Sequence, residues 1–214
     1  THANINKSTI LTNLETWYKN NLVQFEDKLA DIIWCNDKST FTTYTSGSTY
    51  GTGLGYGINK TGYGTYNRIY GGDAASSAAP SLICQNDDNG GKLSKFTVND
   101  TTNGNGNLTY RIGLLTADEI AFAGYTSYLN NTATYLQENA ADDWWLLSPY
   151  GFNGVADVWS IVNGYLYNYY EYAMAMENFS VNNTNNGIRP AIALTSDVLI
   201  SDGSGTSEDP YTIK

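Results

Sequence analysis

The chain has 214 residues and a net charge of −10, with 11 lysines and arginines in all. Its length suits one well-packed domain. Its acidity argues against nucleic acid or an anionic membrane surface as a partner, since both require a basic footprint. No apolar stretch approaches the roughly 20 residues of a membrane-spanning helix, so no membrane span is expected. Few charged residues (15%) beside abundant polar residues and tyrosine are typical of secreted β-rich domains, so an extracellular location is expected.

A first helix is predicted close to the N-terminus. Apolar residues recur at helical spacing from Ile10 to Phe25. Asn6 or Ser8 is placed to cap the first turn, and the helix is expected to end near Ala30.

A long surface loop is predicted over residues 37–79, which are rich in Gly, Ser, Thr and Tyr without clear periodicity. A short helix is expected within it, near residues 63–69. The glycines of this loop lack the Lys-Ser or Lys-Thr pair that a phosphate-binding loop requires, so a nucleotide site is not expected.

A second helix is predicted over residues 114–124. Thr116 and Glu119 have the spacing of a capping box, and Gly124 is placed to end the helix. Asp118 and Glu119 lie in the first turn, where the helix dipole favours negative charge. Capping therefore explains this acidic pair more simply than catalysis does.

The pair Asn163-Gly164 predicts a tight β-hairpin. Both residues tolerate the positive φ of a type I′ turn, and alternating segments flank them on either side. A two-residue loop fixes the register of the strands. The expected pairs are Val162 with Tyr165, Ile161 with Leu166, and Ser160 with Tyr167.

The two faces of this hairpin differ in character. Because side chains alternate along a strand, one face is predicted to be a core face, which holds Trp159, Ile161 and Leu166. The other, called here the phenol face, holds Val158, Ser160, Tyr165, Tyr167 and Tyr169. Recognition surfaces favour tyrosine, but strands also accommodate it by simple packing, so both interpretations stay open.

Further short strands are predicted in the last third of the chain. The candidates are residues 144–147, 173–181, 188–194 and 209–213. The first is expected to stop at Ser148-Pro149. The third is apolar enough to be central, although Pro190 cannot donate a hydrogen bond.

Two helices followed by strands indicate an α+β fold in a single domain that spans residues 1–214.

Cys35 and Cys84 are the two cysteines of the chain. In an exported protein they would form a disulfide that closes a large loop, and the alternative is a pair of buried thiols. The secreted character of the composition favours the disulfide.

The side chains that several kinds of catalysis need are missing or badly placed. His2 is the only histidine, so a Ser–His or Cys–His nucleophile has no suitable base and a His-based zinc site is not expected. Asp142-Asp143 beside two tryptophans resembles a sugar-cleaving cleft, but neighbouring strand residues point to opposite faces. The acidic turn at residues 202–209 lacks the EF-hand pattern, so we interpret it as solvated rather than calcium-binding. No metal and no cofactor are expected.

Recurring sequence blocks lie along nearly the whole chain. Trp145-Leu146-Leu147-Ser148-Pro149 and Asn186-Gly187-Ile188-Arg189-Pro190 follow a W-L-x-S-P … N-G-V-R-P pattern, and further blocks surround Cys35, Cys84, Thr116 and Pro210. Together these blocks resemble an uncharacterised domain family of bacterial exported and surface proteins. The resemblance implies that the chain is the C-terminal part of a longer exported protein.

Arg189 belongs to the last of these blocks. We expect it to be structural and partly buried, and to pair with a carboxylate or with backbone carbonyls, since a buried guanidinium must be satisfied. Asp118 and Glu119 are the candidate partners.

An Asn- and Tyr-rich segment precedes the Gly-Ile-Arg-Pro motif at residues 187–190. This arrangement is similar to C-type-lectin-like domains related to formylglycine-generating enzymes, some of which are variable proteins of diversity-generating retroelements. The resemblance implies a C-type-lectin-like fold with two helices, a small twisted antiparallel sheet and long irregular loops. No cysteine follows Cys84, so the oxidase activity of the enzyme relatives is not expected. The ligand-binding residues that the resemblance implies are Phe152, Asn153, Asp157, Tyr165, Tyr167, Tyr169, Tyr170 and Tyr172.

The leading functional hypothesis is a non-enzymatic recognition or adhesion domain on a bacterial or phage surface. It would bind a protein or a glycan through the phenol face. The first alternative is a structural module of a surface or pilus-like assembly, with the phenol face packed against a neighbouring domain. The second is a carbohydrate-active enzyme that uses Asp142 or Asp143.

Overall fold

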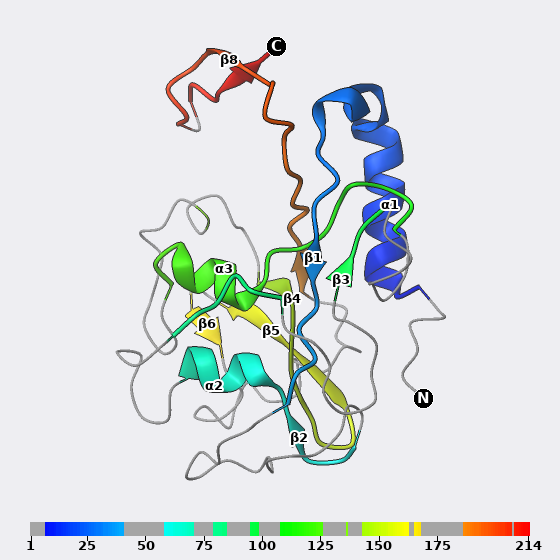
Figure 1. Cartoon of the computed structure of the whole chain (residues 1–214), viewed down its shortest axis with the longest axis vertical. Coiled ribbons are helices and arrows are strands. Elements are labelled where there is room, and N and C mark those ends of the chain that lie inside the picture. Colours follow the sequence, from blue (N-terminus) through cyan, green and yellow to red (C-terminus); the bar gives the residue numbers. More distant parts are fainter. Residues whose placement is uncertain are drawn as a thin grey trace.

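The computed structural model describes residues 7–40, 58–70, 79–84, 95–98, 108–125, 136, 143–162, 165–167, 186–206 and 208–214. These residues form an α+β fold, as predicted (Figure 1). They include three α-helices, one 3-10 helix and nine short strands. None of the helices within these ranges is long and apolar enough to cross a membrane. The predicted strand at residues 173–181 lies outside them, and the single-domain organisation stays a prediction.

Helix α1 (Thr9–Asn21) begins where the sequence predicts and ends earlier. The Ser8 hydroxyl accepts a hydrogen bond from the Leu11 N–H at 3.1 Å, so Ser8 is the N-cap. The predicted end near Ala30 is wrong, because the chain continues from Leu22 as the 3-10 helix η1 (Val23–Lys28). The backbone of Phe25 has φ −114° and ψ 17°, outside helical values, and its side chain is half exposed rather than part of the apolar stripe.

The other two helices lie near their predicted positions. Helix α2 (Gly64–Tyr70) is the short helix expected near residues 63–69. Helix α3 (Ala117–Phe122) starts with the predicted capping box, in which the Glu119 N–H donates to Thr116 Oγ1 and the Thr116 N–H donates to Glu119 Oε2. Gly124, with φ +96°, follows its end. The helix is therefore shorter than the predicted range 114–124, since its first residues serve as the cap and its approach.

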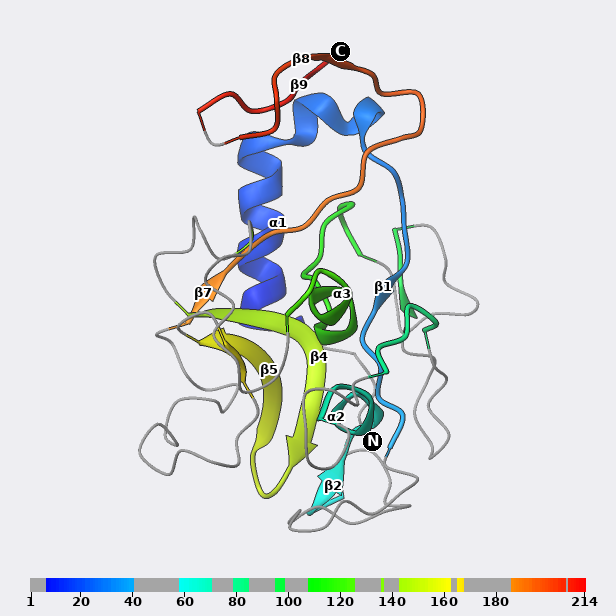
Figure 2. The ribbon, with the colours of Figure 1, turned by 90° about the vertical axis from the view of Figure 1, so that its left-hand side faces the viewer.

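The main sheet has five strands (Figure 2). Their order is β2–β4–β5–β6, and β7 pairs with the first residues of β4, at the other end of that strand from β2. Every pairing is antiparallel except that of β7 with β4. The strands are β2 (Thr61–Gly62), β4 (Trp144–Phe152), β5 (Ala156–Val162), β6 (Tyr165–Tyr167) and β7 (Gly187–Ile188).

Strand β4 continues through Ser148 and Pro149, where the sequence predicted a stop. Pro149 lies opposite Val158, and the register shifts on both sides of this pair. Proline lacks a backbone N–H, and a bulge is a place in a sheet where that donor is not needed. The predicted stop is therefore wrong, and the bulged strand bends instead.

Both faces of the main sheet are covered where β4 begins. Trp144 packs with residues of α2 and α3, and Trp145 packs with Leu14 and Tyr18 of α1. The two rings are only 1% and 3% exposed. Because neighbouring strand residues point to opposite faces, this tryptophan pair anchors one hydrophobic core on each side of the sheet.

The chain after β7 does not form the predicted central strand. With the other described residues it makes two isolated bridges, between Gly113 and Ala191 and between Leu29 and Leu194. Pro190, which has no N–H to donate, is exposed at its start. The prediction of a central strand at residues 188–194 is therefore wrong.

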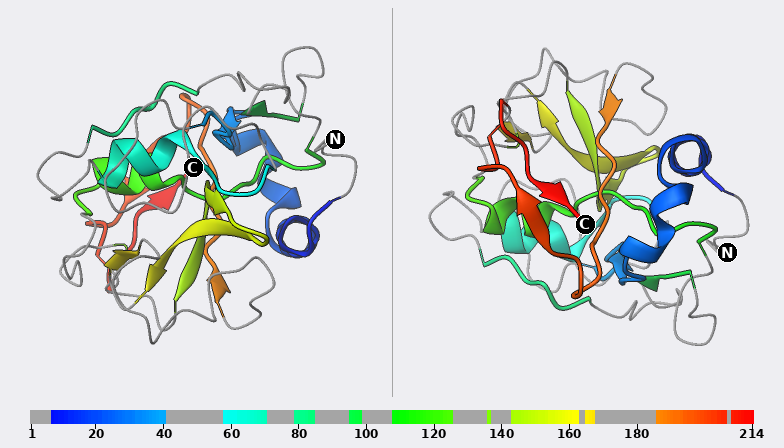
Figure 3. Two further views of the ribbon diagram at one scale, coloured as in Figure 1. Left: turned by 90° about the horizontal axis from the view of Figure 1, so that it is seen from below. Right: turned by 90° about the horizontal axis from the view of Figure 1, so that it is seen from above.

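The C-terminal residues form a separate hairpin at the end of the molecule where η1 lies (Figures 1 and 3). Strand β8 (Ile200–Asp202) pairs with β9 (Thr212–Ile213), which is the closing strand predicted at residues 209–213. In the turn, Asp209 Oδ2 accepts from the Ser204 N–H and Thr206 Oγ1 accepts from the Asp209 N–H. In this way the two side chains satisfy backbone N–H groups of the tight turn.

Gly113 permits a close approach that no other residue would allow. A Cβ built at this position would lie 2.4 Å from Cδ2 of Trp34, whose side chain is only 5% exposed. The Gly113 backbone also exchanges two hydrogen bonds with Ala191, at 3.0 and 2.9 Å, which hold it against the ring.

We therefore expect Gly113→Ala to lower the free energy of unfolding by about 1–3 kcal/mol, as overpacking of a core does. Urea titration would measure the loss. Gly154→Asn is the control, because Gly154 (φ +85°) has open space around its Cβ position and asparagine tolerates positive φ. Equal stability of the Gly113 variant and the wild type would show that Trp34 can move aside.

Candidate functional site

The hairpin that carries the predicted binding tyrosines forms in the predicted register. Ser160 pairs with Tyr167, Ile161 with Leu166, and Val162 with Tyr165. Within the described residues, β6 is the outermost strand on its side of the main sheet. Among the described strands, the backbone of Tyr165 and Tyr167 therefore lies at the sheet edge (Figure 1).

Strand β5 is packed on both of its faces. Trp159 and Ile161 are fully buried, as expected for the core face. On the phenol face, Ser160 is only 1% exposed and Val158 packs against the core formed with α1. Along β5 the phenol face is therefore covered, as the alternative of simple strand packing expects.

The other predicted binding residues that the structure describes lie at the far end of β5. Asp157 pairs with Gly151, and Phe152 pairs with Ala156 next to the exposed turn residue Asn153. At about 3.3 Å per residue, the partners of the two tyrosines lie roughly 10–17 Å from Asp157 along the strand. Asp157 is also buried, at 6% exposure. Phe152, Asn153 and Asp157 therefore lie at the opposite end of β5 from the partners of Tyr165 and Tyr167, while Tyr169, Tyr170 and Tyr172 lie outside the described residues.

Arg189 is partly buried but has different partners from those predicted. Its Cζ atom lies 5.0 Å from the centroid of the Trp144 ring, a cation–π contact. Its Nη1 atom is buried and has no hydrogen-bond partner among the residues that the structure describes. The predicted pairing with Asp118 or Glu119 is wrong, because Asp118 binds Arg68 and Glu119 belongs to the capping box.

Arg68 of α2 lies between two carboxylates, a group that we call the ion centre (Arg68, Asp37 and Asp118). Arg68 Nη2 donates to Asp37 Oδ2 at 2.6 Å and to Asp118 Oδ2 at 2.8 Å, and Nε donates to Asp118 Oδ1 at 2.9 Å. Both aspartate side chains are 5% exposed and the arginine side chain is 18% exposed. Burial lowers the pKa of Arg68, but the hydrogen bonds and charges of Asp118 and Asp37 raise it overall above its ordinary value.

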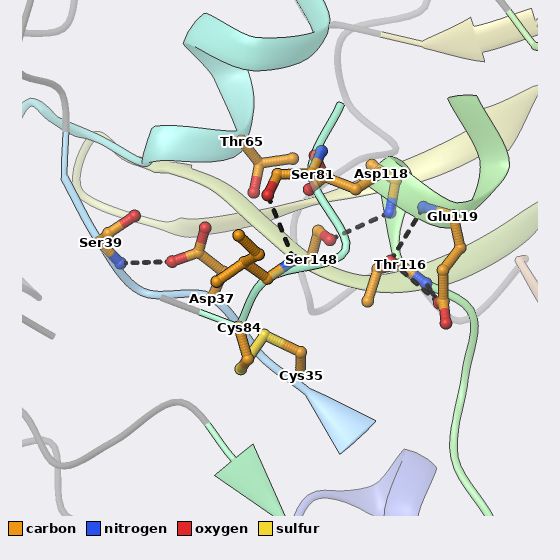
Figure 4. Close-up of a disulfide and its surroundings, with 12 residues drawn as sticks. Cys35, Asp37, Ser39, Thr65, Ser81, Cys84, Thr116, Asp118, Glu119 and Ser148 are labelled. Carbon is orange, nitrogen blue, oxygen red and sulfur yellow. Dashed lines mark hydrogen bonds between the residues drawn. A yellow bond between two sulfur atoms is a disulfide. The ribbon is translucent and has the colours of Figure 1, made fainter. Parts of the chain in front are cut away.

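The ion centre also binds backbone groups from separate parts of the chain. The Ser81 N–H donates to Asp118 Oδ1 at 2.7 Å, and the Ser39 N–H donates to Asp37 Oδ1 at 2.9 Å. Figure 4 shows these groups beside the disulfide. The ion centre thus joins α2, α3, the segment after β1 and residues 79–84. Sequence reasoning missed it, because the dipole of α3 already explained Asp118 and nothing local connects that residue to Arg68.

The predicted disulfide joins Cys35 to Cys84 next to this centre, with their Cα atoms 5.5 Å apart. Cys35 belongs to β1 (Trp34–Cys35), which pairs antiparallel with β3 (Lys95–Phe96). The disulfide therefore fastens residues 79–84 to this two-stranded sheet.

A cavity of about 340 Å³ opens beside the disulfide, and we call it the disulfide cavity. Arg68, Asp37 and Glu119 are among its lining residues, but each is already engaged in the ion pairs or the capping box described above. Its lining residues are Ile33, Trp34, Cys35, Asp37, Arg68, Ser81, Leu82, Ile83, Cys84, Lys95, Thr116, Glu119 and Ser148.

The carboxylates at the disulfide cavity accept hydrogen bonds from the backbone N–H groups of Ser39 and Thr116 and from Arg68. Within the residues that the structure describes, no group of three or more His, Cys, Asp or Glu side chains could hold a metal ion. Comparison of the chain with protein-family models, with curated proteins and with solved structures finds no match.

Proposed function

We propose that the chain is a non-enzymatic recognition domain of the C-type-lectin-like class that binds a protein or a glycan at a bacterial or phage surface. The observation that supports it most is the tight β5–β6 hairpin, whose register carries Tyr165 and Tyr167 on the outermost of the described strands on that side of the main sheet. Tyrosine offers a large, rigid contact area with a polar end at low entropic cost. An outermost strand also offers backbone hydrogen-bonding groups to a partner.

Two further observations favour this proposal over a carbohydrate-active enzyme. Trp144 and Trp145, which follow the acidic pair Asp142-Asp143, are buried in the two cores and have no ring face to stack on a sugar. The disulfide favours an extracellular setting, since cytosolic thiols are kept reduced. Binding at a surface fits both observations.

Replacing tyrosines of the phenol face with alanine tests this proposal. We expect the double variant Tyr167→Ala, Tyr169→Ala to lose capture of its ligand on glycan and host-protein arrays, with about 1–4 kcal/mol lost for each ring, as at interface hot spots. Thermal stability should change little. Tyr211→Ala is the matched control, since that ring is 57% exposed on the separate C-terminal hairpin, and it should leave capture intact.

Two other results would favour one of the alternative functions over the proposed one. Unfolding of the double variant, with no ligand found for the wild type on either array, would favour a structural module whose phenol face packs against a neighbouring domain. A hydrolytic activity that Asp142→Asn or Asp143→Asn abolishes would favour the enzyme.

A further inference from the structure

The C-terminal hairpin exposes apolar side chains along both of its strands. Every residue of β8 and β9 is exposed. Leu199 and Ile200 are each 60% exposed, and Ile213 is 40% exposed. Ile200 lies directly opposite Ile213, so their side chains form an apolar pair on one face of the hairpin. Large apolar side chains that are exposed together mark interaction sites more often than isolated ones do.

Polar contacts in the turn hold the hairpin in shape without a core. The N–H groups of Ser204 and Gly205 donate to the backbone carbonyl of Asp209 at 3.1 and 3.0 Å. The Tyr211 ring packs against Gly205, where a Cβ would lie 2.6 Å from its Cε2 atom. The apolar pair is therefore presented on a preformed turn, and a preformed surface loses little conformational entropy when it binds.

The sheet that the hairpin forms is small. Among the described residues it consists of β8 and β9 alone, apart from the main sheet (Figures 1 and 2). A two-stranded sheet is only marginally stable in water, and its outer edges offer backbone hydrogen-bonding groups to a further strand. An added strand would supply these bonds and cover the apolar pair.

The charges of the hairpin select the kind of strand that can be added. Lys28 of η1 lies near Asp197, but its ammonium also has Asp27 Oδ2 3.8 Å away. Residues 196–214 carry four carboxylates and one ammonium, a net charge of −3, and all five groups belong to exposed residues: Asp197, Asp202, Glu208, Asp209 and Lys214. A second copy of the chain would bring the same negative charge and be repelled, whereas a cationic partner is attracted.

We propose that the C-terminal hairpin binds an extended segment of a partner protein in which basic and apolar side chains alternate. The segment would join the hairpin as a third strand, which is a common way for a sheet edge to bind a peptide. Because side chains alternate along a strand, its apolar side chains would cover Ile200 and Ile213 while its basic side chains meet the carboxylates. This surface is separate from the phenol face, so the inference does not rest on the proposed recognition function.

The probe is a short peptide that alternates lysine and valine, titrated at low salt into the isotope-labelled, disulfide-bonded full chain. We expect saturable shifts and slower hydrogen exchange for the backbone amides of β8 or β9, since new strand pairing protects them. A peptide with glutamate in place of lysine reverses the charge, and a peptide of the same composition with its valines grouped together loses the alternation. Both should bind at least ten-fold more weakly, and added salt should weaken binding of the lysine–valine peptide.

Ile200→Thr removes apolar surface but keeps a β-branched side chain that suits a strand. It should weaken binding at least ten-fold, whereas the control Ile58→Thr, at an isoleucine that is 53% exposed before β2, should bind like the wild type. Asp202→Asn removes a charge, while its Oδ1 can still accept the hydrogen bond from the Gly203 N–H. It should weaken binding several-fold, and it decides the outcome if the threonine variant loses the hairpin signals.

A lysine–valine peptide that causes no saturable shift in β8 or β9 would overturn the proposal. Equal binding by the glutamate peptide, or by variants whose hairpin stays folded, would do the same. Shifts of these amides as the chain's own concentration rises, without peptide, would show that a second copy is the occupant and would also contradict it. The double variant Tyr167→Ala, Tyr169→Ala should bind the peptide like the wild type, which distinguishes this surface from the phenol face.

Discussion

Replacing Arg68 with methionine is expected to lower the free energy of unfolding by about 3–5 kcal/mol, the usual effect of removing one partner from a buried ion pair. The substitution leaves Asp37 and Asp118 close together, each 5% exposed, without the cation between them. Methionine keeps the length and apolar stem of the side chain, so the loss reports on the charge and its hydrogen bonds rather than on a cavity.

Asp27→Asn is the control for the Arg68 substitution, because it removes an exposed ion pair. Lys28 Nζ and Asp27 Oδ2 are 3.8 Å apart, and the aspartate side chain is 73% exposed. Such surface pairs contribute about 0–1 kcal/mol, so the control should remain close to the wild type in a urea titration. An equally small loss for Arg68→Met would mean that water or a rearranged neighbour replaces the guanidinium, and the ion centre would then not be a main support of the fold.

The parts of this fold that local chemistry determines could be predicted from the sequence. The capping box of α3 depends on two residues three positions apart, and the β5–β6 register depends on a two-residue turn. Both signals lie within a few residues of the structure that they determine. The sequence alone was enough for them.

The predictions that failed depend on contacts between distant segments. Arg68 lies 31 residues from Asp37 and 50 from Asp118, and no spacing rule joins residues so far apart. The predicted stop at Ser148-Pro149 is wrong because a bulge opposite Val158 removes the need for a backbone N–H at Pro149. The end of α1 was misplaced because an apolar periodicity continues after Asn21, where the backbone has already left the α-helix.

The prediction of the candidate binding surface is limited in the same way, because it also depends on contacts between distant segments. Alternation correctly separated the two faces of β5, with Trp159 and Ile161 on the core face. It could not show that Val158 on the opposite face packs into the core formed with α1, because that depends on where a helix more than one hundred residues earlier is placed. A period-two pattern identifies a face, and tertiary packing decides whether the face meets solvent.

Removal of the disulfide is the second change that we expect to lower stability strongly. The double variant Cys35→Ser, Cys84→Ser is expected to lower the free energy of unfolding by about 2–5 kcal/mol. The sequence separation of 49 residues makes the closed loop long, and longer loops remove more conformational entropy from the unfolded chain. The wild type treated with a reductant should match the variant in urea titration, since both lack the same bond.

The disulfide and the ion centre should also depend on each other. Residues 79–84 are held at Cys84 by the disulfide and at Ser81 by Asp118, so losing the first contact makes the second easier to break. We therefore expect a double-mutant cycle between the cysteine variant and Arg68→Met to give a coupling free energy of about 0.5–3 kcal/mol, as groups that share a network do. Strict additivity would contradict this, because it would mean that the segment stays on the ion centre without the disulfide.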